Sequence, residues 1–189
     1  MNKTGFVADI EAIRASARKN IKDGAVTEGY KANKEVVIKV LNDALATEVV
    51  CVLRYKSHHY MAKGINSEPI AQEFLEHAIE EQQHADLIST RIVQLGGTPD
   101  LNPKTLTSRS HSEYVQGNTL IEMVKEDLIA ERIAIDTYRE IIKYLGDDDV
   151  TSRRLMEEIL AKEEEHADDL ANLLDQLDPN CGKDGHKKN

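Results

Sequence analysis

The sequence predicts an all-α protein: a four-helix bundle with one long crossover connection and a short extra helix at the N-terminus. Two observations support this prediction. Glu, Lys, Leu, Ile and Ala dominate a chain of 189 residues in which only 4% are aromatic and Trp is absent, and these dominant residue types lose little side-chain freedom in a helix. Four long stretches also show apolar residues at helical spacing, and the four Pro residues lie outside their interiors.

The first segment, residues 1–32, is predicted to be an extension that precedes the bundle. Within it, residues 5–20 have the pattern of a short amphipathic helix, because Phe6, Ile10, Ile13 and Ala17 recur at helical spacing. Acidic residues lie early in this stretch and basic residues late, which complements the helix dipole. The bundle is predicted over residues 33–177, and the polar tail over 178–189 is expected to be disordered.

Each bundle helix is bounded by recognisable start and stop signals. Ser, Thr, Asn and Asp are favoured as N-caps, and Gly ends helices readily. Each predicted helix has roughly 27–31 residues, or about 40–45 Å at 1.5 Å per residue. The four run from about Asn33 to Lys63, from Ser67 to Gly96 and Gly97, from a capping box of Thr119 and Glu122 to Gly146, and from Asp147–Asp149 to just before Pro179.

The lengths of the connections predict how the helices are arranged. Only a few residues join the first helix to the second and the third to the fourth, so each pair should form an antiparallel hairpin. About 22 residues rich in Gly, Pro, Ser, Thr and Asn, without predicted secondary structure, separate the two hairpins. When extended, they reach about 70 Å, which is enough to return the chain along the whole bundle.

The charge distribution favours cations as partners. The net charge is −10, of which residues 1–34 contribute +3 and the remainder −13. An acidic body repels nucleic acid and attracts metal ions. The basic N-terminal segment is the one place where DNA contact would form. An exposed helix of mixed charge is the simpler explanation of this segment, and we expect little DNA binding at physiological salt.

The compartment is predicted to be the cytoplasm. The N-terminus has no apolar run long enough for a signal peptide, and the sequence has no stretch that suggests a membrane span. Cys51 and Cys181 are too few and too far apart for a disulfide framework or a cysteine metal site.

Two Glu-x-x-His motifs carry the predicted chemistry. Glu81 with His84, and Glu163 with His166, each place a carboxylate and an imidazole on one face of a helix. One such motif alone means little, because Glu is abundant and surface pairs at this spacing arise by chance. The position of the two motifs along the hairpins is what distinguishes them.

A further glutamate precedes each motif at nearly the same distance. Glu48 lies 33 residues before Glu81, and Glu131 lies 32 residues before Glu163. Within each hairpin the two glutamates are therefore level, about 20 Å from the turn and near the middle of the bundle. The chain thus contains the same half-site twice: Glu, then Glu-x-x-His.

These polar residues interrupt apolar helix faces, which predicts that they point inward. Four carboxylates buried together would be very costly unless protons or cations compensated them, and two divalent cations neutralise four glutamates. A donor set of carboxylates with one imidazole per ion favours iron or manganese over zinc. The alternative is that the residues are surface or satisfied core polar groups, which explains one motif more readily than all six positions. The predicted metal ligands are Glu48, Glu81, His84, Glu131, Glu163 and His166.

Other residues are weaker candidates. Tyr55 follows Glu48 by seven residues, as Tyr138 follows Glu131, so Tyr55 is a candidate for a redox or hydrogen-bonding role or is a packed core tyrosine. Cys51 is expected to be a small core residue. The remaining histidines without clear partners are His58, His59, His77 and His111, and the glutamates expected to be solvated are Glu80, Glu164 and Glu165.

Over roughly residues 33–177 the sequence resembles the ferritin-like superfamily, bacterioferritins and Dps-like ferritins in particular. The matching segments are EVVCVLRY, EEQQHAD, LGGTP, EDLIAER and EEEHADDL. The resemblance implies a ferroxidase that oxidises Fe(II) with O2 or H2O2 at two iron ions per subunit, stores iron and assembles into a hollow homo-oligomeric shell. It also implies that Glu81 and Glu163 bridge the ions, with Glu48 and Glu131 as terminal ligands.

Departures from the family pattern refine these expectations. Gln82 stands where haem-containing bacterioferritins carry Met, which argues against haem. A fifth C-terminal helix is not expected and an N-terminal extension is present, which favours a dodecamer over a 24-subunit shell. Dps proteins place their metal site between subunits, whereas this one is predicted within one bundle, as in the bacterioferritin-related branch. The alternatives are a di-metal peroxidase or catalase related to rubrerythrin or manganese catalase, and a DNA-protecting shell.

Overall fold

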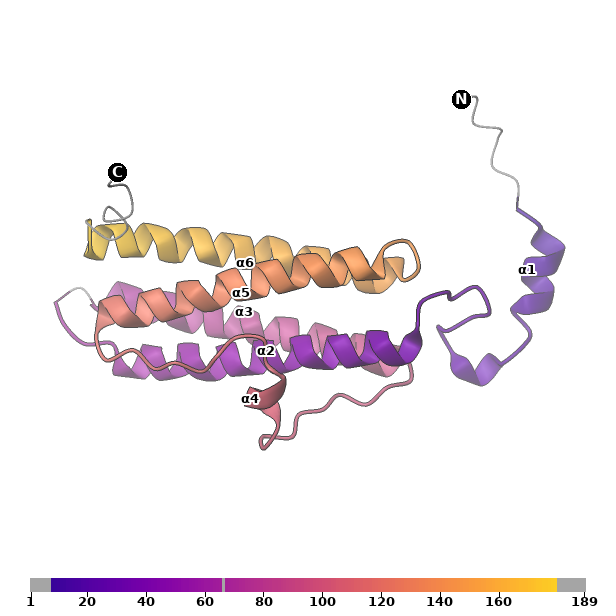
Figure 1. Cartoon of the computed structure of the whole chain (residues 1–189), viewed down its shortest axis with the longest axis horizontal. Helices are drawn as coiled ribbons and strands as arrows, with labels where there is room; N and C mark the ends of the chain where they lie inside the picture. Colours follow the sequence, from indigo (N-terminus) through magenta and orange to yellow (C-terminus); the bar gives the residue numbers. More distant parts are fainter. Residues whose placement is uncertain (1–7, 66, 180–189) are drawn as a thin grey trace, which may run out of the picture.

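Four long helices form a bundle in the computed structural model, which describes residues 8–65 and 67–179 (Figure 1). The predicted all-α bundle is confirmed. Within those residues, no helix is both long and apolar enough to cross a membrane. The bundle helices are α2 (Lys34–Met61), α3 (Ser67–Gln94), α5 (Leu120–Leu145) and α6 (Val150–Leu177).

Side-chain caps fix the starts of three bundle helices. The Asn33 side chain accepts a hydrogen bond from the Val36 backbone N–H at the start of α2. The capping box of Thr119 and Glu122 forms at the start of α5, as predicted. Asp149 caps α6. Helix α3 begins at Ser67 itself, which we had expected to be its N-cap.

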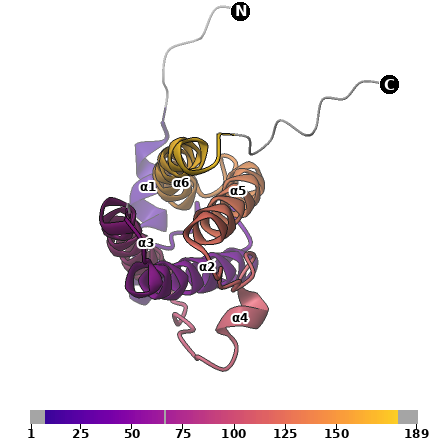
Figure 2. The same ribbon diagram turned by 90° about the vertical axis from the view of Figure 1, so that its left-hand side faces the viewer.

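The helices form two antiparallel hairpins, α2–α3 and α5–α6, which pack against each other (Figure 2). The crossover between them runs along the bundle from the end of α3 to the start of α5 (Figure 1). We predicted no secondary structure in it, and that was wrong: it contains the single-turn helix α4 (Leu106–Arg109). Leu106, the first residue of α4, is buried against Ala46 and Val50 of α2. This apolar contact attaches the single-turn helix to the bundle.

The N-terminal extension contains α1 (Ile10–Ser16) and a 3₁₀ turn over Ile21–Asp23. The helix predicted over 5–20 is therefore too long at both ends: Asp9 is the N-cap and the helix ends at Ser16. Asn20 adopts a left-handed conformation with φ 49°, so the helix could not have continued through it. Residues 5–7 of that prediction, and 180–189 of the predicted tail, lie outside the described residues. Helix α1 buries no residue and lies beyond one end of the bundle (Figure 1). Tyr30 connects the extension to the bundle by donating its hydroxyl proton to Asp149, at 2.8 Å.

Besides the small cluster around Leu106, the described residues form two larger apolar clusters, which are separated by a polar layer. One cluster contains Leu41 and Leu45 of α2 with Ile88 of α3. The other contains Tyr55 of α2 with Phe74 of α3. Glu48 lies on α2 between the two clusters and is buried. The bundle therefore buries ionisable groups at mid-length, where an uninterrupted apolar core would be more stable without a ligand.

Candidate metal centre

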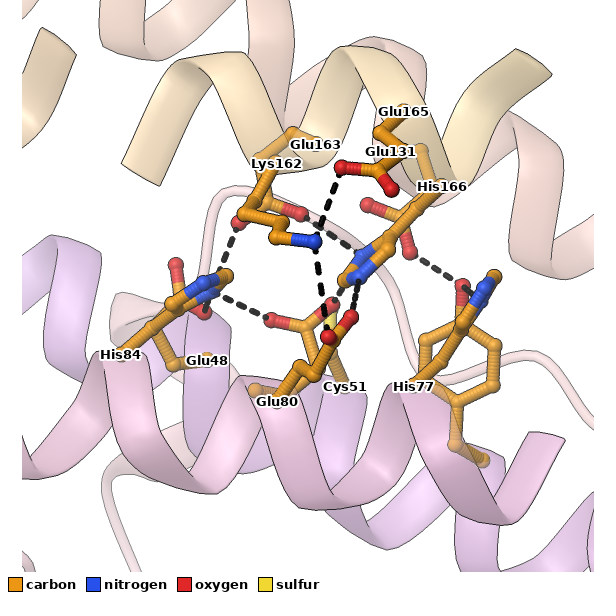
Figure 3. Close-up of polar contacts among 12 residues, drawn as sticks. Glu48, Cys51, His77, Glu80, His84, Glu131, Lys162, Glu163, Glu165 and His166 are labelled. Atoms are coloured by element: carbon orange, nitrogen blue, oxygen red, sulfur yellow. Dashed lines mark hydrogen bonds and ion pairs between the residues drawn. The ribbon is translucent and has the colours of Figure 1, made fainter. Parts of the chain in front are cut away.

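The six residues predicted as metal ligands come together in this polar layer, and Figure 3 labels all of them except Glu81. Each of the four bundle helices contributes: α2 and α5 provide one glutamate each, and α3 and α6 each provide one Glu-x-x-His motif. All are buried, with exposed fractions between 0% and 6%. The members are Glu48, Glu81, His84, Glu131, Glu163 and His166.

The ligand atoms form two overlapping groups. In each group the candidate atoms all lie within 4.8 Å of one another. The first group is Glu48, Glu81, His84 and Glu163, and the second is Glu81, Glu131, Glu163 and His166. Glu81 and Glu163 belong to both groups, so each could hold an ion in either group.

The shared glutamates turn one oxygen towards each histidine. Glu81 Oε2 lies 3.4 Å from His84 Nδ1, while its Oε1 lies 3.5 Å from His166 Nδ1. Glu163 repeats the arrangement, with Oε1 at 3.1 Å from His84 Nδ1 and Oε2 at 3.4 Å from His166 Nδ1. Both histidines therefore present Nδ1 to the interior of the cluster.

Several of these buried atoms have no hydrogen-bond partner among the described residues, although buried polar atoms are nearly always paired. They are Glu81 Oε1, Glu131 Oε2, both oxygens of Glu163, and His166 Nδ1. Their lone pairs converge from three helices. A pair of divalent cations would satisfy these atoms and neutralise the four carboxylates, so the residues fit a two-metal site.

Burial and mutual repulsion shift the pKa values of the carboxyl groups. Burial, followed by the charges of Glu81 and Glu163, raises the pKa of both Glu48 and Glu131 well above the usual value. Burial alone would also raise the pKa of Glu81, but its close contacts with Glu48, His166 and His84 outweigh burial and hold the pKa well below its usual range. Without metal, protons thus remain on part of the cluster.

The two histidines retain protons for the same reason. Burial would lower the pKa of His166, but the close carboxylates of Glu163 and Glu81 outweigh it and raise the pKa to about 12. His84 is shifted in the same direction by Glu163, Glu48 and Glu81 against the effect of burial, so its pKa is raised far above the ordinary value. Imidazolium ions provide positive charge where metal ions would otherwise do so.

Two buried tyrosines hydrogen-bond to the carboxylates that are not shared. Tyr55 donates its hydroxyl proton to Glu131 Oε1, and Tyr138 donates its hydroxyl proton to Glu48 Oε1. Tyr55 is thus a packed core residue and a hydrogen-bond donor at the same time, so the structure combines the two roles that sequence reasoning treated as alternatives.

Two residues that contact the cluster were not predicted to do so. Glu80 was expected to be solvated, which was wrong: its Oε2 lies 2.6 Å from His166 Nε2, and Oε1 pairs with Lys162. His77 stacks on His166, with ring centroids 4.1 Å apart. Its Nδ1 lies 3.2 Å from the hydroxyl of Tyr55. Burial and the nearby His166 lower the pKa of His77 to about 4.

The remaining candidates have other partners. His58 contacts Asp127, His59 contacts the Ala71 carbonyl, and His111 contacts Thr47. Glu164 pairs with Arg139 and Glu165 pairs with Lys162, both with exposed side chains. Cys51 is buried in the apolar cluster that contains Tyr55.

The fold and the cluster together define a class: bundle proteins that gather four glutamates and two histidines from four helices at a common interior point. Comparison with known proteins specifies the family. A family model for the ferritin-like domain matches residues 38–179. The chain belongs to the ferritin family.

Three similar proteins illustrate the relationship. A bacterioferritin from Brucella melitensis is 35% identical over 144 residues, which cover 75% of this chain and 84% of the relative. The structure of the bacterioferritin-related protein from Bacteroides fragilis, described as a dodecameric thioferritin, matches with a TM-score of 0.76 and 31% identity, over 84% of this chain and 94% of that one. The bacterioferritin from Desulfovibrio desulfuricans, in which a diiron site was observed in different catalytic states, matches with a TM-score of 0.69 and 27% identity, over 80% of this chain and 84% of that one.

Proposed function

We propose that this protein is a ferroxidase that stores and detoxifies iron, with two Fe(II) ions as substrates of the buried cluster. The observation that carries the proposal is the sharing of Glu81 and Glu163 by two adjacent ligand groups. Membership of the ferritin family and similarity to bacterioferritins support iron as the metal. The preference of carboxylate-rich sites with one imidazole per ion supports the same choice.

The cluster residues would bind two Fe(II) ions close together and leave room for an oxidant. Glu81 and Glu163 would bridge the ions, while Glu48 with His84 and Glu131 with His166 would complete the two halves. Each Fe(II) loses one electron to become Fe(III). The two electrons, with two protons, reduce O2 to H2O2, or reduce H2O2 to two molecules of water. Protons held by the apo cluster leave as the metal ions bind.

Glu80 would position one of the ligands. His166 would bind metal through Nδ1, which faces Glu81 and Glu163, while its Nε2–H donates a hydrogen bond to Glu80 at 2.6 Å. A carboxylate in this position fixes the tautomer and the ring orientation of the ligand and increases its basicity. Lys162 in turn holds Glu80 at 3.5 Å.

The assembly that suits storage is a closed shell of identical subunits. We propose a dodecamer, because the bacterioferritin-related protein from Bacteroides fragilis is described as dodecameric and matches over most of both chains. Gln82, which pairs with Asp86, argues against a haem ligand at that position. Mineral would form in the interior of such a shell from the Fe(III) released by the cluster.

The substitution Glu163→Gln tests the function. It removes the charge of a shared ligand without changing side-chain volume, and we expect the initial rate of Fe(II) oxidation by O2 to fall about 100-fold or more. Stopped-flow absorbance of Fe(III) formation at two Fe(II) per chain measures that rate. The matched control is Glu164→Gln, which removes an exposed carboxylate one residue away and should leave the rate unchanged.

Equal progress curves for E163Q and wild type would refute the assignment of the cluster. The peroxidase or catalase alternative gives a different result with the wild type: release of O2 from H2O2 by the manganese-loaded protein, followed with an oxygen electrode. Ferroxidase activity instead predicts consumption of O2 or H2O2 in a fixed ratio to the iron added.

A further inference from the structure

A second group of metal-binding side chains lies beside the central cluster, between α3 and α6. Glu73, His77 and Asp169 each offer a ligand atom, and these atoms all lie within 4.8 Å of one another. His77 is buried, whereas the two acids are half-buried. The group therefore connects the interior of the bundle with the solvent.

The hydrogen bonds of His77 determine which nitrogen faces this group. The hydroxyl of Tyr55 has a single hydrogen, which it uses in the hydrogen bond to Glu131. The Tyr55 oxygen therefore accepts a hydrogen bond from the Nδ1–H of His77, at 3.2 Å. The lone pair of neutral His77 then lies on Nε2, which is 3.4 Å from Glu73 Oε1. Two acceptors face each other there, and a cation between them makes the contact favourable.

Neither acid of this group has a basic side chain to balance its charge. Among residues 8–65 and 67–179, no Lys or Arg forms an ion pair with Glu73 or Asp169. Neighbouring acids differ in this respect, since Glu80 and Glu165 both pair with Lys162. Two uncompensated carboxylates with one imidazole nitrogen match the donor set that Fe(II) and Mn(II) prefer.

We propose that Glu73, His77 and Asp169 bind a third divalent transition-metal ion and that Fe(II) passes from this site to the half of the central cluster that contains Glu131 and His166. The connection is His77, which also lies within 4.8 Å of ligand atoms of Glu131 and His166. Rotation of one imidazole exchanges the outer partners for the inner ones. The third site stands on its own geometry, while its role as a feeder rests on the proposed ferroxidase function.

Counting bound ions tests the third site. The full-length protein is titrated anaerobically with Co(II), and the ions bound per chain are determined by calorimetry and metal analysis. We expect three for the wild type and two for the double variant Glu73→Gln/Asp169→Asn. The control variant Glu76→Gln/Asp168→Asn removes two exposed carboxylates from the same helices and should still bind three.

The outcomes separate this proposal from the proposed function. If the wild type and E73Q/D169N bind equal numbers of Co(II), the third site does not exist. If E73Q/D169N loses one ion but oxidises Fe(II) at the wild-type rate, the feeder role is wrong. We expect oxidation at two Fe(II) per chain to slow about tenfold in this variant, because it lacks two carboxylates that attract cations. If neither the wild type nor any variant oxidises Fe(II), the ferroxidase proposal fails. The number of Co(II) ions bound per chain still shows whether the third site exists.

Discussion

At the scale of single residues, the cluster shows an internal symmetry. Tyr55 on α2 donates to Glu131 on α5, and Tyr138 on α5 donates to Glu48 on α2. In each helix the tyrosine follows the glutamate by seven residues, which places the two side chains on one face about two turns apart. Each hairpin therefore orients one carboxylate of the other.

These hydrogen bonds should matter for metal binding. A hydroxyl donor fixes the rotamer of a carboxylate and favours its charged form, which is the form that binds metal. We expect Tyr55→Phe and Tyr138→Phe each to weaken Co(II) binding at the central cluster by about tenfold, a typical effect of losing a group that orients a ligand. Anaerobic calorimetric titration measures the change.

The symmetry makes this prediction more specific. The two variants should lose similar amounts of Co(II) affinity, but in different halves of the cluster. Tyr60→Phe is the control, since the Tyr60 ring is 78% exposed and the substitution should not alter the affinity. Unchanged affinity in both Y55F and Y138F would show that the tyrosines only fill space.

The six cluster residues could be found from sequence because each depends on a one-dimensional regularity. A helical repeat places Glu81 with His84, and equal spacing along two hairpins places Glu48 and Glu131 level with the two motifs. Glu80 and His77 follow no such regularity. Glu80 reaches His166 only because α3 and α6 pack with a particular rotation, and this rotation depends on tertiary contacts. Their helix faces were visible in the sequence, but their partners were not.

At the scale of helices, the buried ion pair of Arg54 and Asp127 joins the two hairpins. Arg54 Nε on α2 donates to Asp127 Oδ1 on α5 at 2.8 Å, and its Nη1 donates to the Glu113 carbonyl of the crossover at 3.0 Å. Both side chains of the pair are buried. His58 Nδ1 lies 2.8 Å from the other Asp127 oxygen. A single arginine therefore contacts α5 and the crossover that leads to it.

Arg54→Met should destabilise the protein strongly. It leaves Asp127 and the Glu113 carbonyl without their main donor, and breaking one side of a buried ion pair costs about 3–5 kcal/mol. We expect a loss of this size in the free energy of unfolding from urea denaturation at neutral pH and a fixed protein concentration. Lys39→Met removes an exposed partner of Asp43 and should change the stability by no more than about 0.5 kcal/mol. A loss below about 1 kcal/mol for R54M would mean that the pair adds no stability.

The order and bounds of the long helices were predictable because caps, Gly stops and periodicity agree over many residues. Helix α4 was missed because one turn around Leu106 contains too few residues to show a period, and its formation depends on contact with α2. The N-terminal helix was overextended because the apolar spacing continued to Ala17, while Asn20 turns the chain. Local pattern thus predicts long elements, and tertiary contact decides short ones.

At the scale of the whole molecule, the surface of the bundle carries apolar side chains that a single subunit leaves exposed. Leu53 and Tyr60 of α2 are 52% and 78% exposed and lie seven residues apart, on one face of the helix. Ile13 of α1 is 54% exposed, but α1 lies outside the segment that matches the ferritin-like domain. Such exposure is typical of surfaces that subunits cover in an assembly.

The proposed shell can be tested through these residues. We expect native mass spectrometry of the wild type to give a mass of twelve chains of 21.2 kDa each, and the double variant Leu53→Lys/Tyr60→Lys to give mainly smaller species, because two ammonium groups on a subunit contact would lose hydration on burial. Ile13→Lys places the same charge on α1 and should keep the wild-type mass. A mass of twenty-four chains would contradict the dodecamer, and a wild-type mass of one chain would contradict the shell itself. If L53K/Y60K retains the wild-type mass, this face of α2 does not form the contact, and the subunits associate through other surfaces of the bundle.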